Sequence, residues 1–243
     1  MNGVGASEPI MQCDHGCSGD ENQPLDKYKI ESEASSLPIL ERHPHVNSVP
    51  GLSLFLDFMT EAEESQVAAI VDTLPWSGYG IPPNPELKRR TQQYGFLFLF
   101  RTRKIVASLA PLPDFSQFLI DRMRLPKYGV FVDTPPNHVL INEYQVGQGI
   151  MPHVDSKDTF GPTVTSLSLL SPCVMTFTNK TTGVQSHVLL PRRSLLVLTG
   201  DARDKYTHAI SKDDTVFAKG ELVERGRRIS LTIRSILDSA IPK

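Results

Sequence analysis

Short runs of aliphatic and β-branched residues fill the C-terminal part of the chain and constrain its fold more than any other feature. Six of them, separated by Gly, Pro, Asn and Asp, are HVLINEYQ, TVTSLSLL, PCVMTFTN, SHVLLP, SLLVLTG and ISLTIRSI. Runs of this length and spacing are typical of β-strands joined by turns. The pattern therefore predicts a double-sheet β fold or a barrel, and it does not favour βαβ units.

The segment before these runs mixes helical and extended patterns. A folded region is expected to begin at Pro50, with a short strand in GLSLFLDF and a helix in TEAEESQVAAIVDTL. Thr60 and Glu63 have capping-box spacing at the start of this helix, and Pro75 ends it. YGFLFLF is predicted to be one strand, and LPDFSQFLIDRMRL an amphipathic helix. Its expected inward face carries Phe115, Phe118, Leu119 and Met123. The fold class is thus mainly β with flanking helices.

The N-terminal stretch has a different composition. Residues 1–50 hold eight acidic and three basic residues, and the stretch is rich in Ser and Pro but poor in aromatics. Such a composition buries too little apolar surface to order itself, so residues 1–45 are predicted to be a disordered acidic tail. The motif CDHGC within it offers three soft ligands, fewer than the four of a structural zinc site, which favours a chance cluster.

The composition of the whole chain excludes several classes of protein. The formal net charge is −2, and three cysteines are too few for a disulfide framework. No apolar run reaches the roughly 18 residues that would span a bilayer, and the first residues lack a signal-peptide pattern. We therefore expect a globular protein of the cytoplasm or nucleus with no membrane partner.

Candidate metal ligands lie between and after the predicted strands. His153 and Asp155 are two residues apart, and in an extended chain such residues point to the same face. His208, farther along, could complete a set of two histidines and one carboxylate. This set leaves coordination positions open and suits non-haem Fe(II). Taken alone, the H-x-D pattern is weak, because a single histidine in a strand is more often packed or exposed than metal-bound.

A second group of polar residues recurs at alternate positions. Arg228, Ser230, Thr232 and Arg234 alternate with Ile229, Leu231 and Ile233, so the first four share one face of a strand. Two buried arginines would need an anionic partner, and a dicarboxylate co-substrate fits the planar guanidinium fork. A surface strand with its arginines in water would show the same alternation. Asn142 and Tyr144 also share a face, and Asn142 precedes His153 by eleven residues.

Residues 88–104 interleave basic and aromatic side chains. The segment LKRRTQQYGFLFLFRTRK suits contact with phosphates combined with stacking on bases. An ordinary strand, with its phenylalanines in the core and its basic residues in water, fits the same pattern equally well.

These motifs, in this order and spacing, resemble the AlkB family of Fe(II)- and 2-oxoglutarate-dependent dioxygenases. N-x-Y, H-x-D, the later H-A-I and R-x-S-x-T-x-R carry the likeness, which is greatest to the eukaryotic homologues six and eight of the family. The resemblance implies a dioxygenase domain over residues 50–240, with a double-stranded β-helix, or jelly roll, over 137–236 and a helix–strand lid before it. Residues 88–104 would belong to that lid.

The resemblance also implies roles for individual residues. Fe(II) would be held by the catalytic set His153, Asp155 and His208. The co-substrate 2-oxoglutarate would be bound by Asn142, Tyr144, Arg228 and Arg234, and O₂ is the other co-substrate. Substrate contacts in the lid would come from Arg89, Arg90, Tyr94 and Phe96. Ser230 departs from the bacterial pattern, which has Asn at this position.

The implied activity is oxidative demethylation or hydroxylation of modified bases in nucleic acid. 2-Oxoglutarate would be converted to succinate and CO₂, and a hydroxylated N-methyl group would leave as formaldehyde. Two alternatives remain open: a protein side-chain hydroxylase or demethylase of the same fold, and a non-catalytic nucleic-acid-binding module. The sequence does not distinguish DNA from RNA and does not indicate the oligomeric state.

Overall fold

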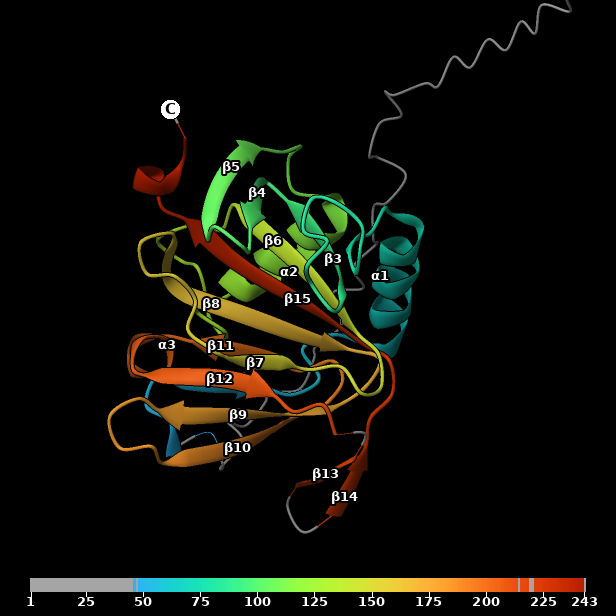
Figure 1. Ribbon diagram of the computed structural model, residues 1–243, viewed down its shortest axis with the longest axis vertical. Helices are drawn as coiled ribbons and strands as arrows, with labels where there is room; N and C mark the ends of the chain where they lie inside the picture. Colours follow the sequence, from blue (N-terminus) through green and yellow to red (C-terminus); the bar gives the residue numbers. More distant parts are fainter. Residues whose placement is uncertain (1–45, 47, 214, 219–220, 243) are drawn as a thin grey trace, which may run out of the picture.

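The computed structural model describes residues 46, 48–213, 215–218 and 221–242 (Figure 1). The predicted acidic tail and its CDHGC motif lie outside the described residues. Within the described part of the chain, no helix is both long and apolar enough to cross a membrane.

Two antiparallel sheets form the body of the protein. The larger sheet has the strand order β1 (Leu52–Phe55), β11 (Leu195–Leu198), β8 (Phe160–Leu169), β15 (Arg228–Ile236), β6 (His138–Tyr144), β3 (Arg90–Tyr94) and β2 (Ser77–Gly78). The smaller sheet has the order β10 (Gln185–Leu190), β9 (Cys173–Asn179), β12 (Tyr206–Ile210) and β7 (Ile150–His153). All six predicted strand runs are therefore confirmed, and the mainly β, jelly-roll fold class with them.

Two helices cover the outer face of the larger sheet (Figure 1). α1 (Glu61–Thr73) begins at the expected capping box, in which the side chains of Thr60 and Glu63 each accept a hydrogen bond from the other's backbone N–H. α2 (Asp114–Arg124) buries Phe115, Leu119 and Met123, while Phe118 is only partly buried. These side chains pack against apolar residues of β6, β8 and β15, so one face of the sheet is sealed by helices.

The inner face of the larger sheet meets the smaller sheet. Apolar side chains of β1, β6 and β11 form one cluster with those of β9, β10 and β12. β15 shows how both faces are used. Ile229, Leu231 and Ile233 are fully buried on the helix side, and the alternate residues, from Arg228 to Arg234, face the other sheet. The two covered faces leave this strand no side in water.

YGFLFLF does not form one strand, and that prediction was wrong. Tyr94 ends β3, and Phe96 begins β4 (Phe96–Leu99), which pairs with β5 (Lys104–Ser108) as a separate hairpin. Gly95 lies between them with φ of +80°, and a Cβ there would be 1.9 Å from the carbonyl oxygen of Asn137. The left-handed backbone at this glycine redirects the chain, so the aromatic residues on its two sides belong to different sheets.

Short elements complete the fold. α3 (Gly200–Asp204) follows β11, a 3₁₀ turn spans Asp238–Ala240, and β13 (Thr215–Ala218) pairs with β14 (Glu221–Glu224). β7, β12, β13 and β14 were not predicted from the sequence as separate strands. Of these four strands, β7 and β12 carry the candidate ligands His153 and His208, which lie opposite each other in the strand register.

Candidate active site

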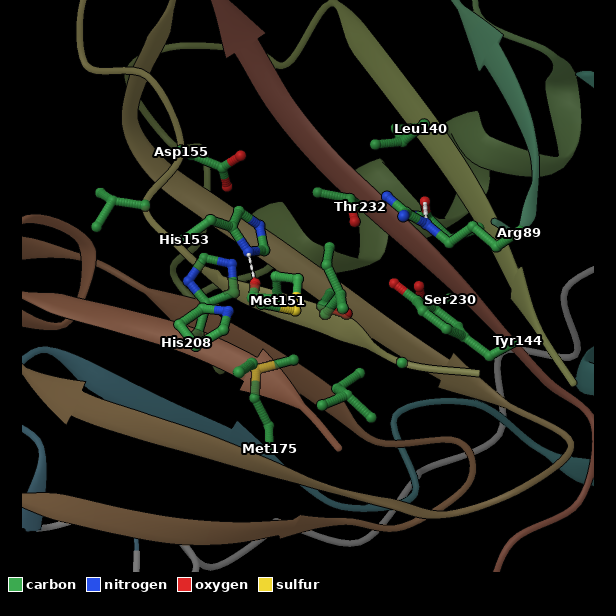
Figure 2. A pocket seen from close by; sticks show the side chains of 18 of the residues that line it. Arg89, Leu140, Tyr144, Met151, His153, Asp155, Met175, His208, Ser230 and Thr232 are labelled. Atoms are coloured by element: carbon green, nitrogen blue, oxygen red, sulfur yellow. Dashed lines mark hydrogen bonds between the residues drawn. The ribbon is translucent and has the colours of Figure 1, made fainter. Parts of the chain in front are cut away.

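Two histidines face each other across neighbouring strands of the smaller sheet. His153 at the end of β7 is directly opposite His208 in β12, and their ring centroids are 4.2 Å apart (Figure 2). Nδ1 of His153 lies 2.8 Å from the carbonyl oxygen of Met151. A carbonyl can only accept, so Nδ1 carries the proton and Nε2 keeps a free lone pair. Metal-bound histidines are commonly oriented by a hydrogen bond of this kind from the second ring nitrogen.

The ionisation of these groups is suited to holding a cation. Burial, together with the neighbouring His153 ring, lowers the pKa of His208 to about 4. Burial also lowers the pKa of His153. Burial opposes the ionisation of Asp155, but Arg234 and the two histidines outweigh it and lower its pKa to about 2. Two neutral imidazoles and one carboxylate are thus present at neutral pH, which is the donor chemistry of a facial Fe(II) site.

Asp155 lies beyond the strand that the sequence pattern assumed. β7 ends at His153, and Asp155 follows in a loop, where its Oδ1 accepts a hydrogen bond of 2.7 Å from Nη1 of Arg234. Within the described residues, no three His, Cys, Asp or Glu side chains are placed close enough together to hold a metal ion. Arg203 of α3, which no sequence motif indicated, donates to the carbonyl oxygens of Asp155 at 2.7 Å and Ser156 at 3.2 Å. The backbone of the loop is thereby tied to α3.

Arg228 is buried on the inner face of the larger sheet. It is 2% exposed and pairs in register with Tyr144, over whose ring its guanidinium lies at 5.5 Å. Nη2 donates to Oγ of Ser168 at 2.8 Å, whereas Nε and Nη1 have no partner among the described residues. Burial of unpaired cationic donors is costly unless an anion meets them. The alternative of a surface strand with its arginines in water is excluded.

Arg234 lies at the opposite end of the same strand. Its guanidinium stacks 3.4 Å from the ring centroid of Phe160, and Nε donates to Nδ1 of His138 at 3.3 Å. Burial lowers the pKa of Arg234 to about 10, so this side chain remains cationic at neutral pH. It therefore joins the carboxylate of Asp155 to the inner face of β15.

These residues line one cavity of about 950 Å³ between the two sheets (Figure 2). Figure 2 shows His153, His208 and Asp155 on one side of it, with Tyr144, Ser230 and Arg89 on the other. All seven candidate iron and co-substrate residues are in its wall: Asn142, Tyr144, His153, Asp155, His208, Arg228 and Arg234. Ser230, which replaces the bacterial Asn, also lines it, beside Asn142 in the strand register.

The four predicted substrate contacts do not lie together. Arg89 lines the cavity, but Arg90 points to the opposite face of the sheet, where it pairs with Glu143 and stacks on Trp76. Tyr94 is packed edge-to-face against Phe115, and its hydroxyl donates to Gln92. Phe96 packs on the small apolar cluster beneath the β4–β5 hairpin. Phe98 and Phe100, which belong to the same basic–aromatic segment, do line the cavity, as does Phe160, which no sequence motif indicated.

A second cleft, of about 930 Å³, adjoins the cavity. Four residues line both: Arg103, Val154, Asp155 and Ser156. The cleft lies between the turn of the β4–β5 hairpin, the loop after β7 and the C-terminal 3₁₀ turn. Its basic side chains are Arg103, Lys104, Lys157 and Lys180; the acidic ones are Asp155, held by Arg234, and Asp158.

Comparison with known proteins agrees with this geometry. The model of the 2OG-Fe(II) oxygenase superfamily matches residues 52–234. The chain is 32% identical over 211 residues to the alkylated DNA repair protein ALKBH8 homolog of Arabidopsis thaliana, a match that covers 78% of this chain and 59% of that protein. It is 26% identical over 189 residues to the DNA N6-methyl adenine demethylase of Caenorhabditis elegans, covering 76% of this chain and 60% of that protein. The chain thus spans about three-fifths of the length of these two relatives.

A solved structure, that of OsALKBH1, shares the fold. It aligns with a TM-score of 0.57 at 18% identity and covers 76% of this chain and 97% of that one. The strand arrangement, the motifs in register on facing strands and the match over residues 52–234 lead to one conclusion: the protein belongs to the 2OG-Fe(II) oxygenase superfamily and, within it, to the AlkB family.

Proposed function

We propose that the protein is an Fe(II)- and 2-oxoglutarate-dependent dioxygenase that demethylates or hydroxylates modified bases in nucleic acid. The observation that carries the proposal is that one cavity has candidate metal ligands on one side and a candidate carboxylate-binding group on the other. Two neutral imidazoles and an ionised carboxylate lie on one side. A buried guanidinium, two of whose nitrogens have no partner among the described residues, lies on the other. The first set would hold Fe(II) through His153, Asp155 and His208; the second is suited to a carboxylate.

The co-substrate fits the second set by charge and by hydrogen bonding. 2-Oxoglutarate carries a carboxylate at each end. Nε and Nη1 of Arg228, which no described residue accepts from, offer a charge-assisted contact to one of them. Asn142 and Tyr144, on the adjacent strand, would donate further hydrogen bonds. Arg234 would lie by the metal-proximal end, because its guanidinium already contacts Asp155.

The protein contributes position and the exclusion of water. Fe(II) held by His153, Asp155 and His208 would supply the oxidation when 2-oxoglutarate and O₂ are bound: 2-oxoglutarate would give succinate and CO₂, and a substrate C–H bond would be hydroxylated. Arg203 and Arg234 fix the backbone and the carboxylate of Asp155, and the bond to Met151 fixes the tautomer of His153. The two sheets cover the cavity on both sides. A hydroxylated N-methyl group would then release formaldehyde.

A nucleic-acid substrate is supported by the basic cleft that opens from the cavity. Enzymes that modify bases rotate the target out of its stack, so its backbone phosphates must lie just outside the pocket. Arg103, Lys104 and Lys180 are at that position, beside the loop that carries Asp155. One AlkB-family relative is named as a DNA N6-methyl adenine demethylase, which agrees with this substrate class.

The activity is tested by measuring succinate formed from 2-oxoglutarate with Fe(II). His208→Ala is the informative variant, because this side chain makes ring contacts with His153 and Phe177 and anchors no buried charge. We expect loss of turnover with an unchanged melting temperature. Turnover that persists in the folded variant would contradict the assigned ligand set.

The substrate class is tested by comparing methylated oligonucleotides with a peptide library as stimulators of turnover. Lys104→Glu with Lys180→Glu should weaken oligonucleotide binding and flatten its salt dependence, by about 0.7 in log–log slope for each single-strand phosphate that the protein no longer neutralises. Lys127→Glu, beyond the end of α2, is the matched control and should change neither the affinity for the oligonucleotide nor its salt dependence. Stimulation by a peptide and not by any oligonucleotide would instead identify a protein side-chain oxygenase.

A further inference from the structure

Arg89 is the one predicted substrate contact that lies in the cavity, and its surroundings differ from those of a phosphate-binding residue. Its side chain is buried, at 8% exposure, and its guanidinium lies 5.7 Å from the ring centroids of both Phe100 and Tyr144. Its Nε donates a hydrogen bond of 2.7 Å to Oδ1 of Asn142 (Figure 2). The adjacent Lys88, by contrast, is exposed and forms no ion pair among the described residues.

The bond to Asn142 determines which way its amide faces. Arginine has no acceptor atom, so only the amide oxygen of Asn142 can take this bond. The Nδ2 group, with its two N–H donors, must then occupy the other side of the amide. Asn142 is itself a wall residue of the cavity, opposite Ser230 in the strand register. Arg89 therefore fixes Asn142 as a donor toward any ligand between the sheets.

Arg89 also contributes charge at the end of the cavity where Arg228 lies. Both guanidiniums lie against the ring of Tyr144, Arg89 at 5.7 Å and Arg228 at 5.5 Å. Within the described residues, neither forms an ion pair with a carboxylate. Glu143, next in sequence to Asn142, is held on the opposite face of the sheet by Arg90 and Arg227. This end of the cavity therefore has two cations that form no ion pair among the described residues.

We infer that Arg89 is a positioning residue of the co-substrate site, which acts through Asn142, and that it is not a contact to the nucleic-acid backbone. The inference rests on the proposed function, since it requires that 2-oxoglutarate bind in this cavity. The amide donors that Arg89 orients would contact a co-substrate oxygen, and its charge would add to that of Arg228.

Two substitutions of similar size separate the two proposed effects of Arg89, the orientation of the Asn142 amide and the positive charge. In Arg89→Gln the amide nitrogen occupies the position of Nε along the side chain and can still donate to Asn142. In Arg89→Met the terminal methyl group occupies the position of Nε and cannot donate a hydrogen bond to Asn142. Both remove the charge, so the difference between them isolates the hydrogen bond.

The experiment is calorimetric titration of 2-oxoglutarate into each variant with Mn(II) in place of Fe(II), so that no turnover occurs. We expect Arg89→Met to raise the Kd for 2-oxoglutarate about tenfold, as for loss of a charge-assisted hydrogen bond, and Arg89→Gln to raise it clearly less. Fluorescence anisotropy with a labelled oligonucleotide should give unchanged affinity and salt dependence for both. Lys127→Met, which removes one remote positive charge, should leave all of these values unchanged.

Two outcomes would overturn the inference. Equal losses of 2-oxoglutarate affinity in the Gln and Met variants would mean that Arg89 acts through charge alone and not through Asn142. An unchanged Kd together with a flatter salt dependence of oligonucleotide binding would make Arg89 a phosphate contact. If Arg89→Met does not fold, Asn142→Asp replaces it: this variant accepts from Arg89 but cannot donate, and an unchanged Kd would overturn the inference. Wild-type protein that binds no 2-oxoglutarate would instead refute the proposed function.

Discussion

Arg228 is among the largest fully buried side chains of the part of the chain that the structure describes, and its hydrogen-bond partners there account for only one of its three nitrogens. A guanidinium in this state is stable only if the fold compensates elsewhere or if an anion completes its bonding. Its contacts with Ser168 and the ring of Tyr144 fix the orientation of the guanidinium group. The residue is thus oriented before the co-substrate arrives, and less rotamer entropy is lost on binding.

Arg228→Lys should separate charge from geometry. Lysine keeps the positive charge but loses the planar pair of donors, so we expect the concentration of 2-oxoglutarate required for half-maximal turnover to rise about tenfold or more. Mn(II) binding, followed by electron paramagnetic resonance, should not change, because the candidate metal ligands are on other elements. An unaltered requirement would show that another residue binds the carboxylate.

At the scale of elements, the β4–β5 hairpin depends on one glycine. Gly95 has φ of +80°, and its N–H and C=O bond to Ala110 and Leu109. The redirected chain puts Phe98 and Phe100 in the wall of the cavity and Arg103 at the junction with the basic cleft. The position of the hairpin therefore determines part of the wall of both the cavity and the basic cleft.

Gly95→Ala and Gly80→Ala form a matched pair that tests this. Gly80 has φ of +88°, and a Cβ added there would meet no atom of a described residue within 4 Å. Its substitution should therefore cost only the backbone strain, about 1–2 kcal/mol. A Cβ at Gly95 would also collide with the carbonyl oxygen of Asn137 at 1.9 Å. Urea denaturation should show a distinctly larger loss of unfolding free energy for Gly95→Ala. Equal losses would mean that the hairpin shifts without difficulty.

At the scale of the whole molecule, buried carboxylates join the helical layer to the rest of the fold. Glu63 of α1 forms an ion pair with Arg122 of α2. Glu64, fully buried, accepts from the backbone N–H of Leu170 at 2.7 Å and pairs with Arg192 at 2.5 Å. These bonds connect α1 to α2 and to the loops at the ends of the sheets.

Stability should consequently fall in acid. Burial alone would raise the pKa of Glu63, but hydrogen bonds from Arg122 and Thr60 outweigh it, and the pKa is lowered from 4.5. A lowered pKa in the folded state contributes stability that is fully present above pH 4.5 and is lost as the pH falls through the folded value. Urea denaturation between pH 7 and pH 3 should show a smaller decline for Glu63→Gln, which can keep the capping bond, than for the wild type. Equal declines would assign the acid sensitivity to other groups.

Much of the architecture could be predicted because strand and helix periodicity are local properties. The runs around Ile141 and Leu231 and the capping box at Thr60 specify their elements through neighbours a few residues away. The candidate iron and co-substrate residues were found from motif spacing, and the structure brings them to one cavity. The single strand expected through Gly95 was wrong, because the backbone conformation of a glycine depends on what it packs against.

The sequence by itself determined which residues share a face of each strand, because alternation is a property of the extended backbone. Only the tertiary structure decided what covers each face. Arg89 and Arg90 are neighbours with the same charge, yet one lines the cavity and the other pairs with Glu143 and stacks on Trp76. Likewise, alternation in β15 is compatible with arginines in water, and only the second sheet, which covers them, excludes that arrangement. The physical reason is that burial and charge pairing arise between segments far apart in the chain. The local sequence pattern does not specify which of these segments will be in contact.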